Sequence, residues 1–293
     1  MIDSASVPNK PDRPLTGITL MLAAVAAYTV TDSISKYLTG EIHPFQIVWS
    51  RYFVYVFILV PFVLRRGVAA TFDTPHRSIH IWRSALMLAS TAVFVFSLST
   101  LDLVFAVTVA FASPFFVTML SIPVLGEKVG MRRWSAIFVG FLGVLVALQP
   151  GVAFTPWSLL PLASAFIWAV GLILTRLTGS EPPLTMLVYL TAVGLVLSTP
   201  MMLPFWTWPS AWDWGLMIFA AICNLIGFYT MFRAFALAPA STLAPFSYSQ
   251  ILWATLLGWA LMGQIPGFWI YVGGGIVVAS GVYIWHRERM LAR

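Results

Sequence analysis

Long apolar runs separated by short polar breaks organise the whole sequence. An α-helix rises ~1.5 Å per residue, so ~20 mainly apolar residues cross the ~30 Å hydrocarbon core of a bilayer. Measured in this way, the runs predict ten membrane-spanning helices, at residues 16–37, 45–64, 79–101, 104–124, 131–149, 156–178, 184–204, 213–237, 241–262 and 267–285. The predicted fold is therefore an all-α integral membrane protein without an extramembrane domain.

Two of the apolar runs, 79–124 and 213–262, are too long for one helix and must each contain a tight turn. Asp102 is expected to break the first run as a helix N-cap. Pro239 is expected to break the second, because proline cannot continue a helix, and Ser241 can cap the helix that follows. Each run therefore predicts a helical hairpin.

Composition and charge agree with a membrane protein. The chain is 60% hydrophobic and only 9% charged, whereas a soluble domain carries about 25% charged residues. The net charge of +6 does not indicate nucleic-acid binding, because the basic residues cluster in the breaks between apolar runs. Such clusters mark the cytoplasmic side of membrane proteins. With a cytoplasmic N-terminus, only Lys36 and Arg51 among the basic residues fall on the outer side.

Motifs for covalent or metal chemistry are absent from the sequence. Cys223 is the single cysteine, which excludes an intramolecular disulfide and a cysteine-based metal cluster. No Gly-x-x-x-x-Gly-Lys-Ser/Thr phosphate loop occurs, so ATP-driven transport within this chain is excluded. His76 and His80 have the spacing of a helical metal pair, but no third ligand is near in sequence. We therefore expect no catalytic residue, no metal and no cofactor.

The two halves of the chain are predicted to be repeats, at residues 16–150 and 151–285. Leu125-Gly126-Glu127 ends the fourth predicted helix, and Met262-Gly263-Gln264 ends the ninth in the same way. Because each repeat has an odd number of helices, the second must cross the membrane in the opposite orientation. Inverted repeats are typical of secondary transporters, whose halves alternate around one central site. The flanking segments, 1–15 and 286–293, are predicted to be cytoplasmic tails.

The first half resembles a known group of transporters. The features that carry the resemblance are, in order, Asp32-x-x-x-Lys36, Pro44, Arg51, Leu125-Gly126-Glu127 and the glycine-rich stretch 140–150. They are similar to the drug/metabolite transporter superfamily, which is built from EamA-type repeats. The resemblance implies ten helices around a central cavity, a multi-pass protein of the bacterial inner membrane, and export of amino acids, other metabolites or drugs. In length and aromatic content the chain is most similar to exporters of aromatic and other neutral amino acids.

This sequence departs from the superfamily's pattern at two positions. Asp32 stands where many members carry a polar amide, and Gln264 replaces the glutamate expected in the second repeat. Any role of that second carboxylate is therefore not transferred to this chain.

Polar and aromatic residues near mid-membrane are the candidates for substrate binding. The candidates are Phe94, Ser113, Trp168, Asn224, Tyr248 and Gln250, with Thr91, Tyr229, Ser247 and Trp253 as further possibilities on the same helices. Each of them has an alternative role in packing between helices. Pro114 and Pro245 interrupt helical hydrogen bonding near the bilayer centre, which favours the helices at 104–124 and 241–262 as cavity walls.

Three ionisable residues are predicted to lie inside the membrane near its outer side. Asp32 falls ~8 Å below the outer end of the first helix and Arg51 ~9 Å below the outer end of the second. Lys36 is one turn from Asp32 and can approach the same carboxylate. We expect Asp32 and Arg51 to pair or to share a polar network near the outer mouth. The pair would serve as an outer gate, or Arg51 would hold a substrate carboxylate when the pair opens. The alternative is an ion pair with a purely structural role.

The sequence is thus interpreted as a secondary transporter, not an enzyme, that exports small amphipathic metabolites by alternating access. Aromatic or other neutral amino acids are the expected substrates. Membrane lipid is the other expected contact, without nucleic acid or an obligate protein partner. The alternatives are an exporter of lipophilic cations that uses Asp32 and a membrane enzyme acting on lipids. The enzyme is disfavoured because no His, Asp or Glu cluster lies at one interface, and a passive channel is disfavoured by the inverted repeat.

The predicted topology is tested by cysteine labelling. Positions near Arg77, Lys128 and the C-terminus are expected to react only from the cytoplasmic side, because the basic clusters hold these segments there. Positions near Thr207 are expected to react from outside. Labelling of the two termini from opposite sides of the membrane would contradict the ten-helix topology.

Overall fold

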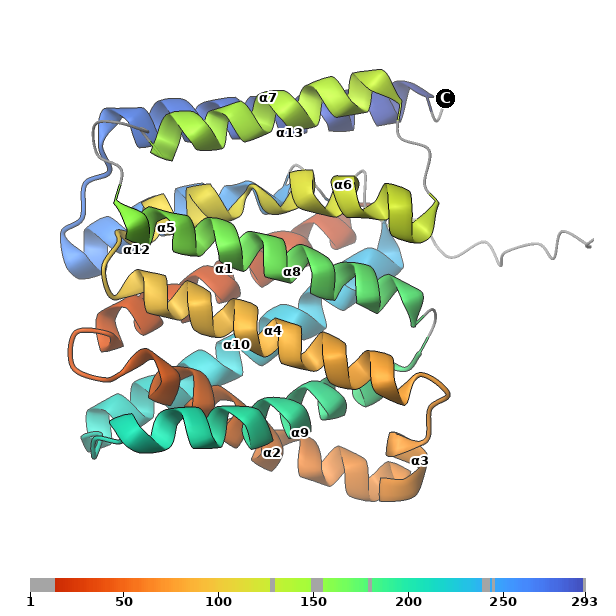
Figure 1. Ribbon diagram of the computed structural model, residues 1–293, viewed down its shortest axis with the longest axis vertical. Coiled ribbons are helices and arrows are strands. Elements are labelled where there is room, and N and C mark those ends of the chain that lie inside the picture. Colours follow the sequence, from red (N-terminus) through yellow and green to blue (C-terminus); the bar gives the residue numbers. More distant parts are fainter. Residues whose placement is uncertain are drawn as a thin grey trace, which may run out of the picture.

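A computed structural model describes residues 14–126, 130–148, 155–178, 181–238, 243 and 246–291. Within these residues every regular element is a helix (Figure 1). The elements are α1 (Pro14–Leu38), α2 (Pro44–Arg66), α3 (Val68–Phe72), α4 (Arg77–Leu98), α5 (Leu103–Ala110), α6 (Ser113–Leu125), α7 (Met131–Leu148), η1 (Pro156–Ser158), α8 (Leu159–Leu177), α9 (Pro183–Met202), η2 (Leu203–Phe205), α10 (Ala211–Leu237), α12 (Ser249–Met262) and α13 (Phe268–Leu291).

Most of the predicted spans coincide with observed helices to within a few residues at their ends, and the exceptions lie at 104–124, 241–262 and 267–285. Among the described residues, 7 helices are long and apolar enough to cross a membrane, and shorter apolar helices occupy 134–148, 249–262 and 268–283. The short helix α3 was not predicted, because its apolar residues follow Gly67 and are too few for a span. Helix α13 runs to Leu291, so most of the expected tail at 286–293 continues the last helix.

The span predicted at 104–124 is divided into α5 and α6 at Phe111 and Ala112. Pro114 lies in the first turn of α6, where a missing N–H has no cost, so the proline starts a helix rather than bending one. Pro239, Ser241 and Pro245, which define the second predicted hairpin, lie outside the described residues, and so does Glu127.

The first predicted hairpin turn is present at Asp102, but the expected cap is not. Asp102 occupies the N-cap position of α5 without a side-chain capping bond. Instead, the backbone N–H of Leu103 donates to Oε1 of Gln264 at 3.3 Å. An orphan donor at the start of a helix needs such an acceptor. The residue that departs from the family pattern therefore ties the end of α12 to the start of α5.

The packing of the helices repeats between the two halves. Helix α1 packs on α10, and its counterpart α8 packs on α4. In the same way α12 packs on α1 and α6 on α8, while α2 packs on α10 and α9 on α4. The last helices of the halves, α7 and α13, lie side by side at one edge of the bundle (Figure 1). This exchange of equivalent contacts is what two inverted five-helix repeats produce.

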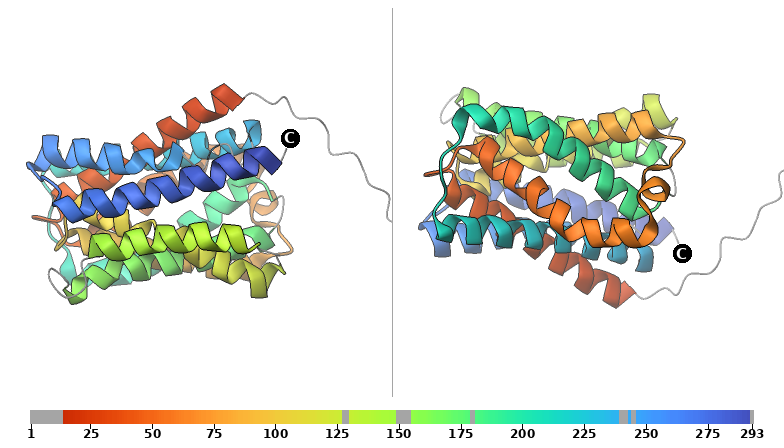
Figure 2. Two further views of the ribbon diagram at one scale, coloured as in Figure 1. Left: turned by 90° about the horizontal axis from the view of Figure 1, so that it is seen from above. Right: turned by 90° about the horizontal axis from the view of Figure 1, so that it is seen from below.

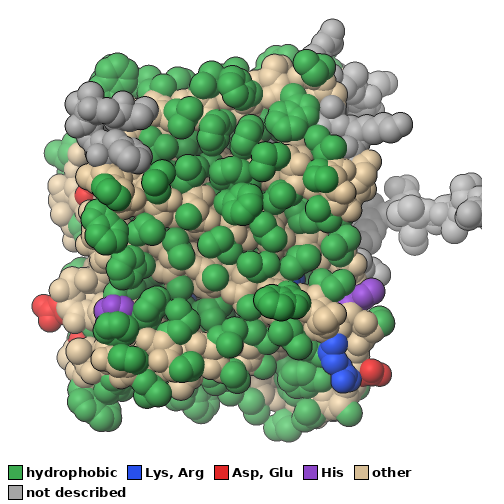
Figure 3. All heavy atoms as spheres, in the orientation of Figure 1, with side chains coloured by type: hydrophobic (Ala, Val, Ile, Leu, Met, Phe, Trp, Pro, Cys, Tyr) green, Lys and Arg blue, Asp and Glu red, His purple; other side chains and the backbone are tan. Residues whose placement is uncertain are grey.

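Apolar side chains dominate the face of the bundle shown in Figure 3, and the coloured charged side chains lie toward the two ends of the helices. Exposed large apolar residues occur along α2, α9, α10, α12 and α13. A soluble protein rarely exposes so continuous an apolar surface. The distribution matches a bundle whose long helices run across a bilayer.

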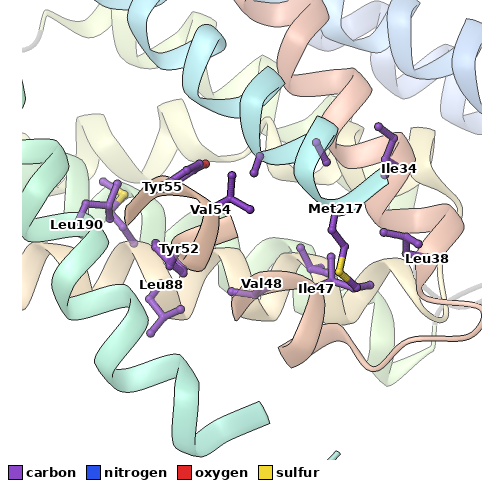
Figure 4. Packing of buried hydrophobic residues seen from close by; sticks show 14 of the residues in the cluster. Ile34, Leu38, Ile47, Val48, Tyr52, Val54, Tyr55, Leu88, Leu190 and Met217 are labelled. Atoms are coloured by element: carbon purple, nitrogen blue, oxygen red, sulfur yellow. The ribbon is translucent and has the colours of Figure 1, made fainter. Parts of the chain in front are cut away.

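One end of the bundle is closed by tight packing. Leu38, Leu98 and Leu103, at the ends of α1 and α4 and the start of α5, are at most 2% exposed. Side chains from α1, α2 and α10 meet beside them, including Ile47 and Met217 (Figure 4). We call this end, which carries the turns at 39–43 and 99–102, the closed end. The start of α1 and the end of α13 lie at the opposite end (Figure 2).

Two polar contacts reinforce the closed end. The Lys36 Nζ donates to the carbonyl of Leu98 at 2.7 Å, which joins α1 to α4. The buried amide of Gln46 bonds both backbone groups of Thr207, donating to its carbonyl at 2.7 Å and accepting from its N–H at 3.1 Å. The connection between α9 and α10 is therefore anchored to the start of α2 through its main chain.

Helices α7 and α13 approach closely because small residues face each other. A Cβ at Gly273 would lie 2.7 Å from the backbone nitrogen of Ala147, and a Cβ at Gly143 would lie 2.8 Å from the carbonyl of Gly273. Gly275 and Ala279, small residues four apart on α13, do not take part in this contact. Both are exposed, and a Cβ at Gly275 would meet nothing within 4 Å.

This interface gives a stability prediction with a control on the same helix. Gly273→Ala is expected to lower the stability of the protein by about 1–3 kcal/mol, because overpacking forces the backbones apart. Gly275→Ala is expected to be neutral or stabilising by about 0.5–1 kcal/mol, since alanine favours the helix. Thermal unfolding of both variants in detergent measures the difference. Equal unfolding temperatures would contradict the close backbone contact.

Candidate functional site

A cavity of about 620 Å³ lies inside the bundle. Side chains of both repeats line it, from α1, α2, α4 and α6 on one side and from α8, α10, α12 and α13 on the other. Pockets for small molecules commonly have volumes of about 300–1,000 Å³ and combine apolar walls with a few polar groups. The cavity has both properties and is the candidate functional site.

Most of the residues predicted from the sequence lie on the wall of this cavity. Those on the wall are Asp32, Arg51, Thr91, Phe94, Ser113, Trp168, Asn224, Ser247, Tyr248 and Gln250. Lys36, Tyr229 and Trp253 are not part of the wall. Lys36 reaches the Leu98 carbonyl instead, and Tyr229 is 64% exposed on the outer face of α10. A role of the wall residues in substrate binding stays a prediction.

Aromatic rings form much of the wall, and several of them were not predicted. Tyr28 and Tyr55 lie one helical turn from Asp32 and Arg51, so the four-residue spacing along α1 and α2 contained the signal. Tyr28 packs edge to face on Phe228 at 5.5 Å between ring centroids. Figure 4 shows Tyr55 beside Tyr52, which also reaches the cavity. Such walls hold flat apolar ligands well, because aromatic pairs favour defined geometries.

The position of Tyr248 depends on a glycine of the last helix. Its ring covers Gly281 of α13 so closely that any Cβ at that position would collide with the ring. The ring also lies 5.1 Å from that of Phe111, at the break between α5 and α6. Tyr248 is therefore held between the two repeats.

Hydrogen bonds fix the polar groups of the wall. The Tyr55 hydroxyl donates to Oδ1 of Asn224 at 2.6 Å, which links α2 to α10. The hydroxyls of Ser90 and Ser164 lie 3.0 Å apart and link α4 to α8. The two links lie in different helix contacts, one between α2 and α10 and the other between α4 and α8. They leave a preorganised polar frame across an apolar cavity.

Asp32 and Arg51 both line the cavity, and no direct ion pair within 4 Å joins them in this conformation. The Arg51 Nη2 donates to Oγ of Ser35 at 2.5 Å, and Gln250 Nε2 approaches Oδ2 of Asp32 at 3.5 Å. Arg51 Nε is buried without an acceptor. Arg51 is nevertheless close enough to act on the Asp32 carboxylate electrostatically. Ser35, one residue before Lys36, is thus the hydrogen-bond acceptor of the Arg51 guanidinium.

Arg83 is a cavity residue that the sequence reasoning missed. It was counted among the cytoplasmic basic residues because it lies near the start of α4. The structure places it on the cavity wall, 6% exposed, with Nε donating to Thr175 Oγ1 at 2.7 Å. The signal was its helical spacing, since Arg83, Met87 and Thr91 lie on one face of α4.

The histidines do not form a metal site in the described part of the chain. His80 lies 3.4 Å from the Glu181 carboxylate, and Glu181 also accepts a hydrogen bond from Thr74. No group of three His, Cys, Asp or Glu residues suited to a metal occurs among the described residues. His80 therefore joins α4 to the turn before α9.

Comparison with known proteins agrees with this architecture. The model of the EamA-like transporter family matches residues 15–149 and 155–285. A riboflavin transporter of Vibrio cholerae is 29% identical over 96% of both chains. An S-adenosylmethionine uptake transporter of Rickettsia prowazekii is 26% identical over 94% of both chains. The Pseudopaline exporter CntI of Pseudomonas aeruginosa is 23% identical over 90% of this chain and 94% of its own.

A solved crystal structure has the same fold. It superposes with a TM-score of 0.70 on 95% of this chain and 99% of its own, at 19% sequence identity. The architecture is therefore found in experimental structures, although so low an identity carries no statement about function.

The cavity geometry gives a prediction for Arg51. Arg51→Gln removes the cation near Asp32 and the donor to Ser35, and a charged hydrogen bond of this kind corresponds to roughly a 10- to 100-fold effect. We expect substrate counterflow in proteoliposomes to fall by that factor while the protein still folds. Arg51→Lys is expected to retain only part of the wild-type counterflow, because lysine lacks the two-pronged donor geometry of arginine.

The double variant with Asp32→Asn and Arg51→Gln separates function from structure. A structural pair predicts that neutralising both partners restores the unfolding temperature and counterflow together. Full recovery of counterflow would therefore reject a functional role for Arg51, whereas recovery of stability alone supports it.

Proposed function

The chain belongs to the EamA-like transporter family, and on this premise we propose that it carries aromatic metabolites across the cytoplasmic membrane by alternating access. Family membership makes it a multi-pass membrane transporter rather than an enzyme. The proposal concerns the substrate class, the mechanism and the orientation. It includes the two cytoplasmic termini expected from the basic clusters.

The observation that carries the substrate class is the aromatic wall of the cavity. Trp168, Tyr28, Tyr55 and Tyr248 present ring faces and edges to about 620 Å³ of space, with Asn224 supplying an amide. Riboflavin and S-adenosylmethionine, for which two relatives are named, both contain fused nitrogen-rich rings with polar substituents. A substrate of this kind fits the volume better than a single amino acid. Aromatic amino acids, expected from the sequence, remain the smaller members of the class.

Alternating access is supported by the inverted repeat and by the closed end. Leu38, Leu98 and Leu103 are buried at the closed end. The two halves form equivalent contacts, α1 with α10 and α8 with α4. The two halves can therefore exchange conformations, so that the protein closes at the opposite end. The predicted topology assigns the closed end to the outside. With this assignment, we infer that the observed conformation is the one that exchanges substrate with the cytoplasm.

Export of lipophilic cations is the weaker alternative. It needs a carboxylate among aromatic rings, and Asp32 beside Tyr28 is the candidate. Arg51 lies within electrostatic reach of this carboxylate and opposes the binding of a second cation. The relatives are named both for uptake and for export, so the comparison does not set the direction of transport. In the assay, the gradients set it.

Counterflow into proteoliposomes tests the proposal. The purified protein is reconstituted into proteoliposomes, which are loaded with unlabelled riboflavin, S-adenosylmethionine or tryptophan. The entry of the same labelled compound is then followed without ATP. We expect counterflow of at least one compound, with Trp168→Leu reducing it by roughly tenfold or more, since loss of an aromatic contact and its buried area weakens binding.

Trp259→Leu is the matched control, because Trp259 is 60% exposed on α12 and does not line the cavity. It is expected to keep wild-type counterflow. An equal loss in the two tryptophan variants would contradict the site. The absence of counterflow with every aromatic compound would contradict the substrate class.

A further inference from the structure

We propose that Arg83 forms an anion-binding subsite in the cavity, so that the preferred substrate combines an aromatic body with one carboxylate or phosphate group. The inference deepens the proposed function and rests on it. Neither the family match nor the names of the relatives assign this residue a role.

The guanidinium of Arg83 has donor capacity that the protein does not use. Its Nε is bound to Thr175 Oγ1 at 2.7 Å, which fixes the orientation of the planar group. Its Nη1 is buried and has no hydrogen-bond acceptor. An unsatisfied arginine inside a membrane-spanning helix is costly and marks functional sites. A ligand oxygen at the cavity wall would supply the missing acceptor in a charge-assisted bond.

Among the residues that the structure describes, no acidic side chain is paired with Arg83. None of the described carboxylates lies within 4 Å of the Arg83 guanidinium. The contact of His80 with Glu181 is the only ion pair in which both partners are described. Glu181 is also engaged by Thr74, so the acid of the adjoining turn is already occupied. Arg51 differs, because Asp32 lies within electrostatic reach of it. Arg83 is therefore a buried cation of the cavity wall without a carboxylate partner among the described residues.

Simple snorkelling does not account for this arrangement. A snorkelling arginine keeps its charged head in water at the membrane surface. Arg83 is 6% exposed and lies six residues inside the start of α4, which corresponds to ~9 Å along the helix. Arg233, which is exposed on α10 and absent from the cavity wall, shows the ordinary alternative.

The spacing along α8 indicates the shape of the ligand. Trp168 and Thr175 both line the cavity and are separated by seven residues, or two helical turns. This separation corresponds to ~10 Å. A ring system against Trp168 thus leaves room for a linker before an anionic group reaches Arg83 beside Thr175. Asp32 is farther away, near the closed end, so the anion does not meet its repulsion at short range.

Matched ligand pairs test the subsite. Riboflavin and flavin mononucleotide differ by a phosphate, and indole-3-acetamide and indole-3-acetate differ by a carboxylate charge at nearly constant shape. Their dissociation constants for the detergent-solubilised wild type and for Arg83→Gln, Arg83→Lys and Arg233→Gln are measured by fluorescence. We expect the wild type to bind the anionic member of at least one pair about 10- to 100-fold more tightly.

Arg83→Gln is expected to remove this preference while leaving the affinity for the neutral member within about twofold, because glutamine keeps a polar amide but has no charge. Arg83→Lys is expected to keep part of the preference, since lysine retains the charge without the fork. Arg233→Gln, which removes one positive charge at the same end of the bundle, is expected to leave the preference unchanged. A preference confined to one pair identifies the anionic group as phosphate or carboxylate.

Three results would overturn the subsite. They are equal wild-type affinity for both members of each pair, equal weakening of both members by Arg83→Gln, and loss of the preference in Arg233→Gln. If Arg83→Gln does not fold, the subsite is tested by the wild-type preference for the anionic member and by its partial loss in Arg83→Lys. Failure of the proposed function has a different signature, since no aromatic compound would then show counterflow, whatever its charge.

Discussion

The absence of water in the hydrocarbon core is the constraint on which the rest of this structure depends. Every polar group between the membrane surfaces must find a partner inside the protein. Hydroxyls such as those of Thr29 and Ser33 return to carbonyls of their own helix. Longer polar side chains instead join different helices, as Lys36 does with Leu98. Buried polar groups without a partner are therefore informative, because no water is available there to offset the free energy of their unsatisfied hydrogen bonds.

The cavity follows from the same constraint. Its walls are mostly apolar and aromatic, and its polar groups are fixed in pairs such as Tyr55 with Asn224. The break between α5 and α6 and the Tyr248 ring, which packs on Gly281, bring the two repeats together around one space. A single central site shared by two inverted halves is the arrangement from which alternating exposure can arise.

Most of the fold could be predicted from the sequence, because membrane thickness fixes the length of an apolar helix. The turn at Asp102 was also predictable, but its capping partner Gln264 is 161 positions away in the sequence and becomes a neighbour only after folding. Helix rotation was harder to predict. Gly275 and Gly273 differ by two positions, and only the packing of α13 on α7 decides which of them faces its neighbour.

The candidate site shows the same limit. Phe94 and Trp168 were predicted from their depth and chemistry, and both reach the cavity wall. Arg83 was treated as a topology signal, because a basic residue near a helix end has the same appearance in the sequence whichever way it faces. Its helical register with Thr91 was the evidence that separated the two cases.

The anchor between Gln46 and Thr207 places unequal demands on its two partners. Gln46 must keep its amide, because that group bonds both the carbonyl and the N–H of Thr207. Position 207 supplies these two bonds from its main chain, and its hydroxyl adds only one further bond to Gln46 Oε1 at 3.2 Å, so a substitution there would keep the main-chain anchor. The connection between α9 and α10 can thus vary its surface chemistry from one species to the next while its path stays the same.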